Sequence, residues 1–155
     1  MSCYYFAYGS NMNQARMKAR KMAVCEVLGG TLQGCQLAFN KLAADAPHRS
    51  YANIRYAPNE HVQGVLYRLD SLTEIERMDP FEGAPRFYSR EIYLIDTVQG
   101  PIAAWVYIAN RAMINEHLKP DRWYLEHLLA GREFLTDDYH QALSEVLCNE
   151  DPQST

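Results

Sequence analysis

Two short stretches hold residue types and spacings that could carry out chemistry. The first is Tyr8-Gly9-Ser10-Asn11, where an aromatic, apolar run gives way to a polar, helix-prone one. Backbone amides at a helix start bind anions such as a carboxylate or an oxyanion. Gly9 would let a ligand approach the chain closely, or let the backbone adopt positive φ. The alternative is a simple connector, in which Asn11 only caps the following helix.

The second stretch surrounds Glu82, which stands between Phe81 and Gly83 in a segment interrupted by Pro80 and Pro85. Apolar surroundings raise the pKa of a carboxyl group by desolvation, toward the range that suits a general base. The alternative is a solvated glutamate in a turn.

Tyrosine is unusually frequent, with 11 in 155 residues. Tyr8, Tyr88, Tyr107 and Tyr124 each fall at or near the end of a predicted element. Tyrosines in such places either pack in the core with the hydroxyl at its rim or line a polar pocket. The spacing is compatible with both.

Composition narrows the function classes. The net charge of −4 argues against general nucleic-acid binding. We interpret the basic group that follows the turn as a solvated helix face rather than a phosphate site: Arg16, Lys18, Arg20 and Lys21. The five histidines lack metal-ligand spacing, and the four cysteines are expected to be unpaired thiols. We expect no metal or cofactor, no signal peptide, no membrane span and a cytoplasmic location.

Strands dominate the first two thirds of the chain and helices the remainder. We expect strands over 4–8, 24–32, 36–39, 52–56, 62–69, 88–96 and 102–108, with a loop over 41–50 and a hairpin turn over 57–61. A short helix should run from Asn11 or Asn13 to about Lys21. Frequent hairpins favour an α+β fold, with a mixed, largely antiparallel sheet curled into a barrel and flanked by helices.

Helix ends carry their own signals. Ser71 and Glu74 have the spacing of a capping box, and the helix that they begin should stop before Pro80. Asp121 and Thr136 are expected to cap the last two helices, the second of which carries an apolar face of Tyr139, Leu143, Val146 and Leu147. We expect one domain over 1–148 and a polar, frayed tail over 149–155.

Taken together, the two stretches resemble the γ-glutamylcyclotransferase family (AIG2-like). The similarity rests on "YFAYGSN" from Tyr5 to Asn11 and "FEGAPRFY" from Phe81 to Tyr88, with "KPDRWYLEHLLAG" from Lys119 to Gly131 similar to a pocket-closing helix. It extends over nearly the whole chain. Met12 departs from the family pattern, which often has leucine there, and the position of Tyr88 relative to the glutamate varies among relatives.

The resemblance implies a cofactor-independent enzyme that cyclises a γ-glutamyl group to 5-oxoproline and frees the attached amine. Glu82 would be the general acid/base, and Asn53 a supporting residue. The substrate-binding residues would be Tyr5, Phe6, Ala7, Tyr8, Gly9, Ser10, Asn11, Tyr88, Tyr107 and Tyr124. The substrate would be a γ-glutamyl amino acid or amine; the alternatives are a larger biosynthetic intermediate, or a non-catalytic module that binds a γ-glutamyl metabolite or a partner. We expect a monomer or a homodimer, with glutathione a less favoured substrate.

Overall fold

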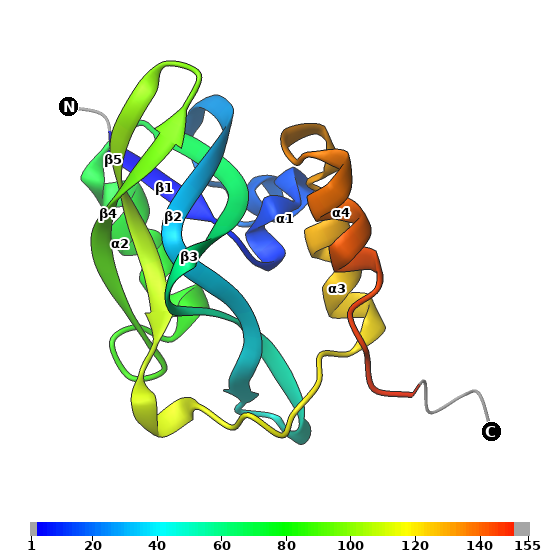
Figure 1. Cartoon of the computed structure of the whole chain (residues 1–155). Coiled ribbons are helices and arrows are strands. Elements are labelled where there is room, and N and C mark those ends of the chain that lie inside the picture. The colour runs from blue at the N-terminus through cyan, green and yellow to red at the C-terminus, as the bar shows by residue number, and fades with distance from the viewer. Residues whose placement is uncertain (1–2, 151–155) are drawn as a thin grey trace.

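Five strands close into a barrel in the computed structural model, which describes residues 3–150 (Figure 1). The strands are β1 (Cys3–Ala7), β2 (Val24–Ala43), β3 (Ala46–Leu69), β4 (Tyr88–Thr97) and β5 (Gly100–Ala109). Their order around the barrel is β1-β3-β2-β4-β5. All neighbouring pairs are antiparallel except β1 and β5, which run parallel and meet at Tyr5 and Trp105. The predicted α+β class and barrel are confirmed.

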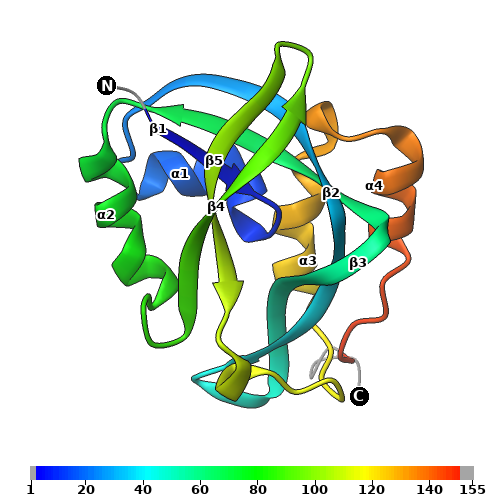
Figure 2. The same cartoon turned by 60° about the vertical axis from the view of Figure 1, so that its left-hand side comes forward.

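The helices lie on two sides of this barrel. Helix α2 (Leu72–Glu82) lies on one side, whereas α3 (Arg122–Leu129) and α4 (Asp137–Ser144) pack together on the other, as Figure 2 also shows. Helix α1 (Gln14–Ala19) follows a single 3₁₀ turn, η1 (Ser10–Met12); two more such turns are η2 (Arg111–Met113) and η3 (Arg132–Phe134). No helix of residues 3–150 is long and apolar enough to cross a membrane.

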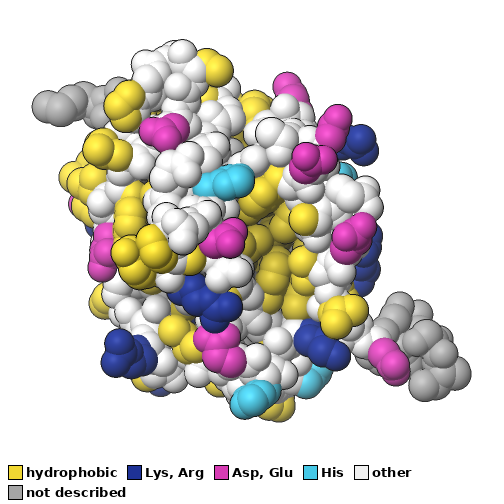
Figure 3. Space-filling view, in the orientation of Figure 1, with side chains coloured by type: hydrophobic (Ala, Val, Ile, Leu, Met, Phe, Trp, Pro, Cys, Tyr) yellow, Lys and Arg dark blue, Asp and Glu magenta, His cyan; other side chains and the backbone are white. Residues whose placement is uncertain are grey.

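The face seen in Figure 3 is chemically mixed. Lys and Arg side chains are scattered among Asp and Glu rather than gathered, and hydrophobic side chains collect in the hollow between the strands and helices α3 and α4.

Strands β2 and β3 form one long hairpin, which corrects two predictions. The segment 41–50 is not a loop, because β2 continues to Ala43 and β3 begins at Ala46. Nor is 57–61 a hairpin turn. The pairing passes from Gln33–His61 to Cys35–Tyr56, so the residues between them bulge out of a continuous β3. Pro58, which has no amide to donate, is exposed within this bulge, a position that strands tolerate.

Helix α2 begins and ends differently from the prediction. The Ser71 hydroxyl makes no capping bond, and the Glu74 carboxylate instead accepts from the Ala23 amide at 2.9 Å. Glu74 therefore binds the backbone of Ala23, a residue distant in the chain, and does not form a capping box with Ser71. The helix also does not stop before Pro80; it continues to Glu82 and ends at Gly83, which adopts φ 71°. The extension makes Glu82 the last residue of a helix rather than part of an irregular loop.

Three other predicted helix starts are found. Asn13 accepts from the Ala15 amide and Thr136 from the Tyr139 amide, as expected of caps. Asp121 occupies the cap position of α3, but its carboxylate makes no capping bond and instead binds Arg49, Trp123 and Asn149.

The C-terminal predictions need correction. Helix α4 ends at Ser144, and Leu147, expected on its apolar face, is 75% exposed. In the expected frayed tail, the Asn149 side chain donates to Asp121 at 2.7 Å, so the tail is held at least at its first residue. Glu150 is exposed, and 151–155 lies outside the described residues.

Candidate active site

A small pocket lies where β1 ends, around the Tyr8-Gly9-Ser10-Asn11 turn. Its volume is about 30 Å³. Except for Ala7 and Asn53, every residue to which the resemblance gave a role lines it: Tyr5, Phe6, Tyr8, Gly9, Ser10, Asn11, Glu82, Tyr88, Tyr107 and Tyr124, with Ala52 in addition. Ala7 is buried behind the pocket, where its carbonyl oxygen would lie 2.4 Å from a Cβ atom at Gly64. We call this space the inner pocket.

Asn11 joins the turn to Glu82. Its side-chain nitrogen donates to Glu82 Oε1 at 2.9 Å and to the Tyr5 hydroxyl at 2.9 Å, and its side-chain oxygen accepts from Arg20 at 2.8 Å. Its carbonyl accepts from the Tyr67 hydroxyl at 2.6 Å. Asn11 itself is 2% exposed, whereas Glu82 and Arg20 are half-buried. The network fixes the carboxylate at the pocket wall.

The surroundings of Glu82 act on its pKa in opposite directions. Burial raises the pKa of the carboxyl group, which is the largest effect. The positive charges of Arg20 and Arg16, the Asn11 hydrogen bond and the more distant Lys41 charge hold it down, and the net direction is upward. An upward shift of this kind makes the carboxylate a better proton acceptor than a solvated one.

The tyrosines surround the same space but differ in what their hydroxyls do. Tyr8 donates to the carbonyl of Tyr107, and Tyr88 to that of Ala52 at 2.8 Å. The Tyr124 hydroxyl accepts from the Ala52 amide at 2.9 Å, which leaves its own proton available to a ligand. Burial raises the pKa of all three, so they remain neutral donors.

The hydroxyl of Tyr107 points away from the inner pocket. Its hydroxyl donates to Asp79 at 2.7 Å, and Asp79 in turn pairs with Arg90 at 2.9 Å. Its ring therefore lines the inner pocket while its hydroxyl braces α2 against the barrel. Asn53, expected near the turn, instead binds the Ala109 amide of β5 at 2.9 Å and Asn40 at 3.1 Å.

Gly9 is needed for space and not for positive φ. Its backbone has φ −112°, and a Cβ atom there would lie 3.2 Å from both the Tyr124 hydroxyl and the Ala52 side chain. Of the two reasons considered for a glycine, positive φ is wrong, and close approach of a ligand stays a prediction, since the near neighbours are protein side chains.

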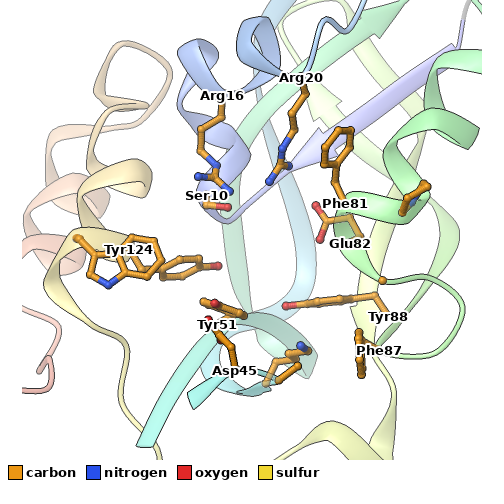
Figure 4. Close-up of a pocket in the computed structure, with 15 residues that line it drawn as sticks. Ser10, Arg16, Arg20, Asp45, Tyr51, Phe81, Glu82, Phe87, Tyr88 and Tyr124 are labelled. Carbon is orange, nitrogen blue, oxygen red and sulfur yellow. The ribbon is translucent and has the colours of Figure 1, made fainter. Parts of the chain in front are cut away.

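A larger cavity of about 320 Å³ opens from the inner pocket and shares Ser10, Glu82, Tyr88 and Tyr124 with it (Figure 4). We call it the outer cavity. Arg16 and Arg20 extend into it from α1. The prediction that these two arginines belong to a solvated face is therefore wrong, whereas Lys18 and Lys21 are exposed as expected.

The sequence reasoning also missed several residues of the outer cavity: Lys41, Asp45, Tyr51 and Trp123. For the arginines a signal existed, because residues four apart share one helix face, and that helix starts at the candidate turn. No local signal marks Lys41, since its strand has the composition of a loop. Among residues 3–150, no cluster of three or more His, Cys, Asp or Glu side chains is placed to hold a metal ion.

The model of the family described as "Gamma-glutamyl cyclotransferase, AIG2-like" matches residues 5–126, well over half of the chain. The chain belongs to this family. The matched range includes the turn, Glu82 and Tyr124, so the residues that line the inner pocket all lie within it. No curated protein sequence matched.

Solved structures share the fold. One titled "Gamma-glutamyl cyclotransferase" has 22% identity and a TM-score of 0.86, covering 98% of this chain and 92% of its own. The uncharacterized human protein loc79017 has 23% identity and a TM-score of 0.82, covering 97% and 90%. A yeast γ-glutamyl cyclotransferase titled as specific to glutathione has 14% identity and a TM-score of 0.66, covering 93% and 94%. At these identities the likeness shows the γ-glutamyl cyclotransferase fold.

Proposed function

We propose that this protein is a γ-glutamylcyclotransferase that converts a γ-glutamyl amino acid or amine to 5-oxoproline and the free amine. The observation that carries the proposal is the half-buried Glu82 carboxylate, held by Asn11 beside the turn that ends β1. Glu82 and the turn residues Gly9, Ser10 and Asn11 line one small pocket. Family membership supports the same reaction class.

In the proposed reaction, the substrate's α-amine attacks its own γ-carbonyl carbon. Only the free amine is nucleophilic, so the α-ammonium first gives a proton to Glu82. A C–N bond forms to close the ring, the amide C–N bond breaks, and Glu82 returns the proton to the departing amine. The ring nitrogen gives up its second proton, again by way of Glu82, to the freed amine, which leaves as an ammonium ion. No water is consumed, and Glu82 ends in its starting state.

The inner pocket would accelerate this reaction by position and charge. Tyrosine rings and Gly9 bound the inner pocket, and at its opening into the outer cavity they would favour a folded γ-glutamyl group with amine and carbonyl in contact. Backbone amides of the turn and the Tyr124 hydroxyl proton are donors that could hold the α-carboxylate or the developing oxyanion.

Product identification tests this proposal. Purified protein is incubated with γ-glutamyl dipeptides and γ-glutamyl amines, and products are quantified by mass spectrometry. We expect 5-oxoproline and free amine in equal amounts. Glutamate in place of 5-oxoproline would show hydrolysis and refute cyclisation. Saturable binding without any product would instead identify a binding module.

A further inference from the structure

The outer cavity adjoins the inner pocket through the four residues that line both, Ser10, Glu82, Tyr88 and Tyr124 (Figure 4). If the γ-glutamyl group lies at the inner pocket and its opening, beside Glu82, the amine half of the substrate must lie in the outer cavity. Its volume of about 320 Å³ suits a group of amino-acid size. The charged side chains that line the outer cavity should therefore decide which amines are accepted as leaving groups.

Lys41 is the most unusual of these charges. The residue is only 3% exposed, yet within residues 3–150 its ammonium has no ion-pair partner. The ammonium lies over aromatic rings instead, 4.7 Å from the centre of Phe87 and 5.4 Å from those of Tyr51 and Tyr88. An ammonium on a largely buried side chain, with aromatic rings as its neighbours, is stabilised by an anion that reaches it.

The arginines differ in how far they are already engaged. Arg20 donates to Asn11 and lies 4.7 Å from the ring centre of Phe81. Arg16 makes only a long contact of 3.5 Å to His127, and its buried Nε has no hydrogen-bond partner among the described residues. Arg16 thus retains donors that an anion in the cavity could use.

Acidic side chains do not balance these cations. Besides Glu82, the acid in the cavity wall is Asp45, which is 72% exposed and faces Arg49 at 3.4 Å. A positively charged leaving group would meet Lys41, Arg16 and Arg20, and the aromatic faces that attract cations are already occupied by Lys41.

From these contacts we infer that the outer cavity selects a leaving group that carries a carboxylate, bound by Lys41 with help from Arg16. The inference rests on the proposed cyclotransferase function and narrows it: the substrates are γ-glutamyl derivatives of amino acids or short peptides with a free carboxylate, not of polyamines.

Matched substrates test this selection. γ-Glutamyl-alanine, γ-glutamyl-alaninamide and γ-glutamyl-1,3-diaminopropane present a negative, a neutral and a positive leaving half. We expect kcat/KM for the alanine compound to exceed that for its amide by about tenfold or more, the usual scale of one hydrogen bond to a charged group. The diamine compound should be the poorest substrate. If the protein forms 5-oxoproline but kcat/KM is about equal for the alanine compound and its amide, or is highest for the diamine compound, the inference is overturned and the proposed function stands.

Variants locate the selection at Lys41. We expect Lys41→Met to bring the ratio of alanine to alaninamide close to one and Lys41→Arg to retain most of it. Lys18→Met, which removes an exposed lysine of α1, should leave the ratio as in the wild type. A Lys41→Met protein that folds and keeps the full ratio would overturn the role of Lys41.

A binding experiment covers the case in which no substrate yields 5-oxoproline, which would refute the proposed function. Calorimetry with the Glu82→Gln protein compares γ-glutamyl-alanine and its amide directly, with Lys41 intact. At least about tenfold tighter binding of the alanine compound supports carboxylate recognition, and equal or absent binding overturns it.

Discussion

Replacing Asn11 by leucine should raise the pKa of Glu82, because it removes an uncharged hydrogen-bond donor from the carboxylate. The change removes the donor 2.9 Å from Glu82 Oε1 while keeping a side chain of similar size in a site that is 2% exposed. A donor to a carboxylate stabilises the ionised form and lowers its pKa, so removing it raises the pKa of Glu82 further.

The size of this change follows from the geometry. The Asn11 amide nitrogen has two protons and lies near Tyr5, Met78 and Glu82, so Glu82 receives one hydrogen bond at most. One hydrogen bond to a charged group contributes about 1.5–3 kcal/mol. At about 1.4 kcal/mol per pKa unit, its loss corresponds to about one to two units.

The assay is the pH dependence of kcat/KM for 5-oxoproline release. Its acidic limb reports the general base of the free enzyme, so we expect that limb to move upward by about one to two pH units in Asn11→Leu. Asn53→Leu is the matched control: Asn53 is equally buried, but its partners are Ala109 and Asn40. An unmoved or lowered limb in Asn11→Leu, or an equal shift in Asn53→Leu, would refute the reasoning.

Two further predictions concern stability and are read from denaturant unfolding. Thr136→Ala should lower the free energy of unfolding by about 1 kcal/mol, because Thr136 caps α4 and also binds Gln63. Ser71→Ala should change it by no more than about 0.5 kcal/mol, because the Ser71 hydroxyl makes no capping bond. Equal losses would contradict this account of the two helix starts. Gly64→Ala should cost about 1–3 kcal/mol, because its Cβ would lie 2.4 Å from the Ala7 carbonyl oxygen and 2.8 Å from the Phe6 ring. A variant as stable as the wild type would show that β1 can shift away.

The site could be anticipated from the sequence where its residues lie in contiguous motifs. The turn after β1 and Glu82 are far apart in the chain, but each lies in a recognisable segment. In the structure they are joined by one hydrogen bond, which the Asn11 side chain of the turn donates to Glu82. The barrel followed from the frequency of hairpins. These features depend on local composition and on family pattern, which a sequence displays directly.

Features set by tertiary contacts were not accessible in this way. The capping box at Ser71 and Glu74 is a valid local pattern, but the Ala23 amide takes the glutamate. Arg16 and Arg20 have the composition of a solvated helix face and become part of a cavity only because α1 follows the turn. Lys41 lies in a segment of loop-like composition, and pairing with β3 makes it a buried strand residue.

The most direct test of the central claim is to compare 5-oxoproline formation by Glu82→Gln and Glu76→Gln. Both variants make the same carboxylate-to-amide change on helix α2, but Glu76 is exposed and Glu82 faces the inner pocket. The account predicts that Glu82→Gln loses at least about 100-fold in kcat, the low end for a general base, while Glu76→Gln keeps wild-type activity. Wild-type turnover by a folded Glu82→Gln protein would contradict it.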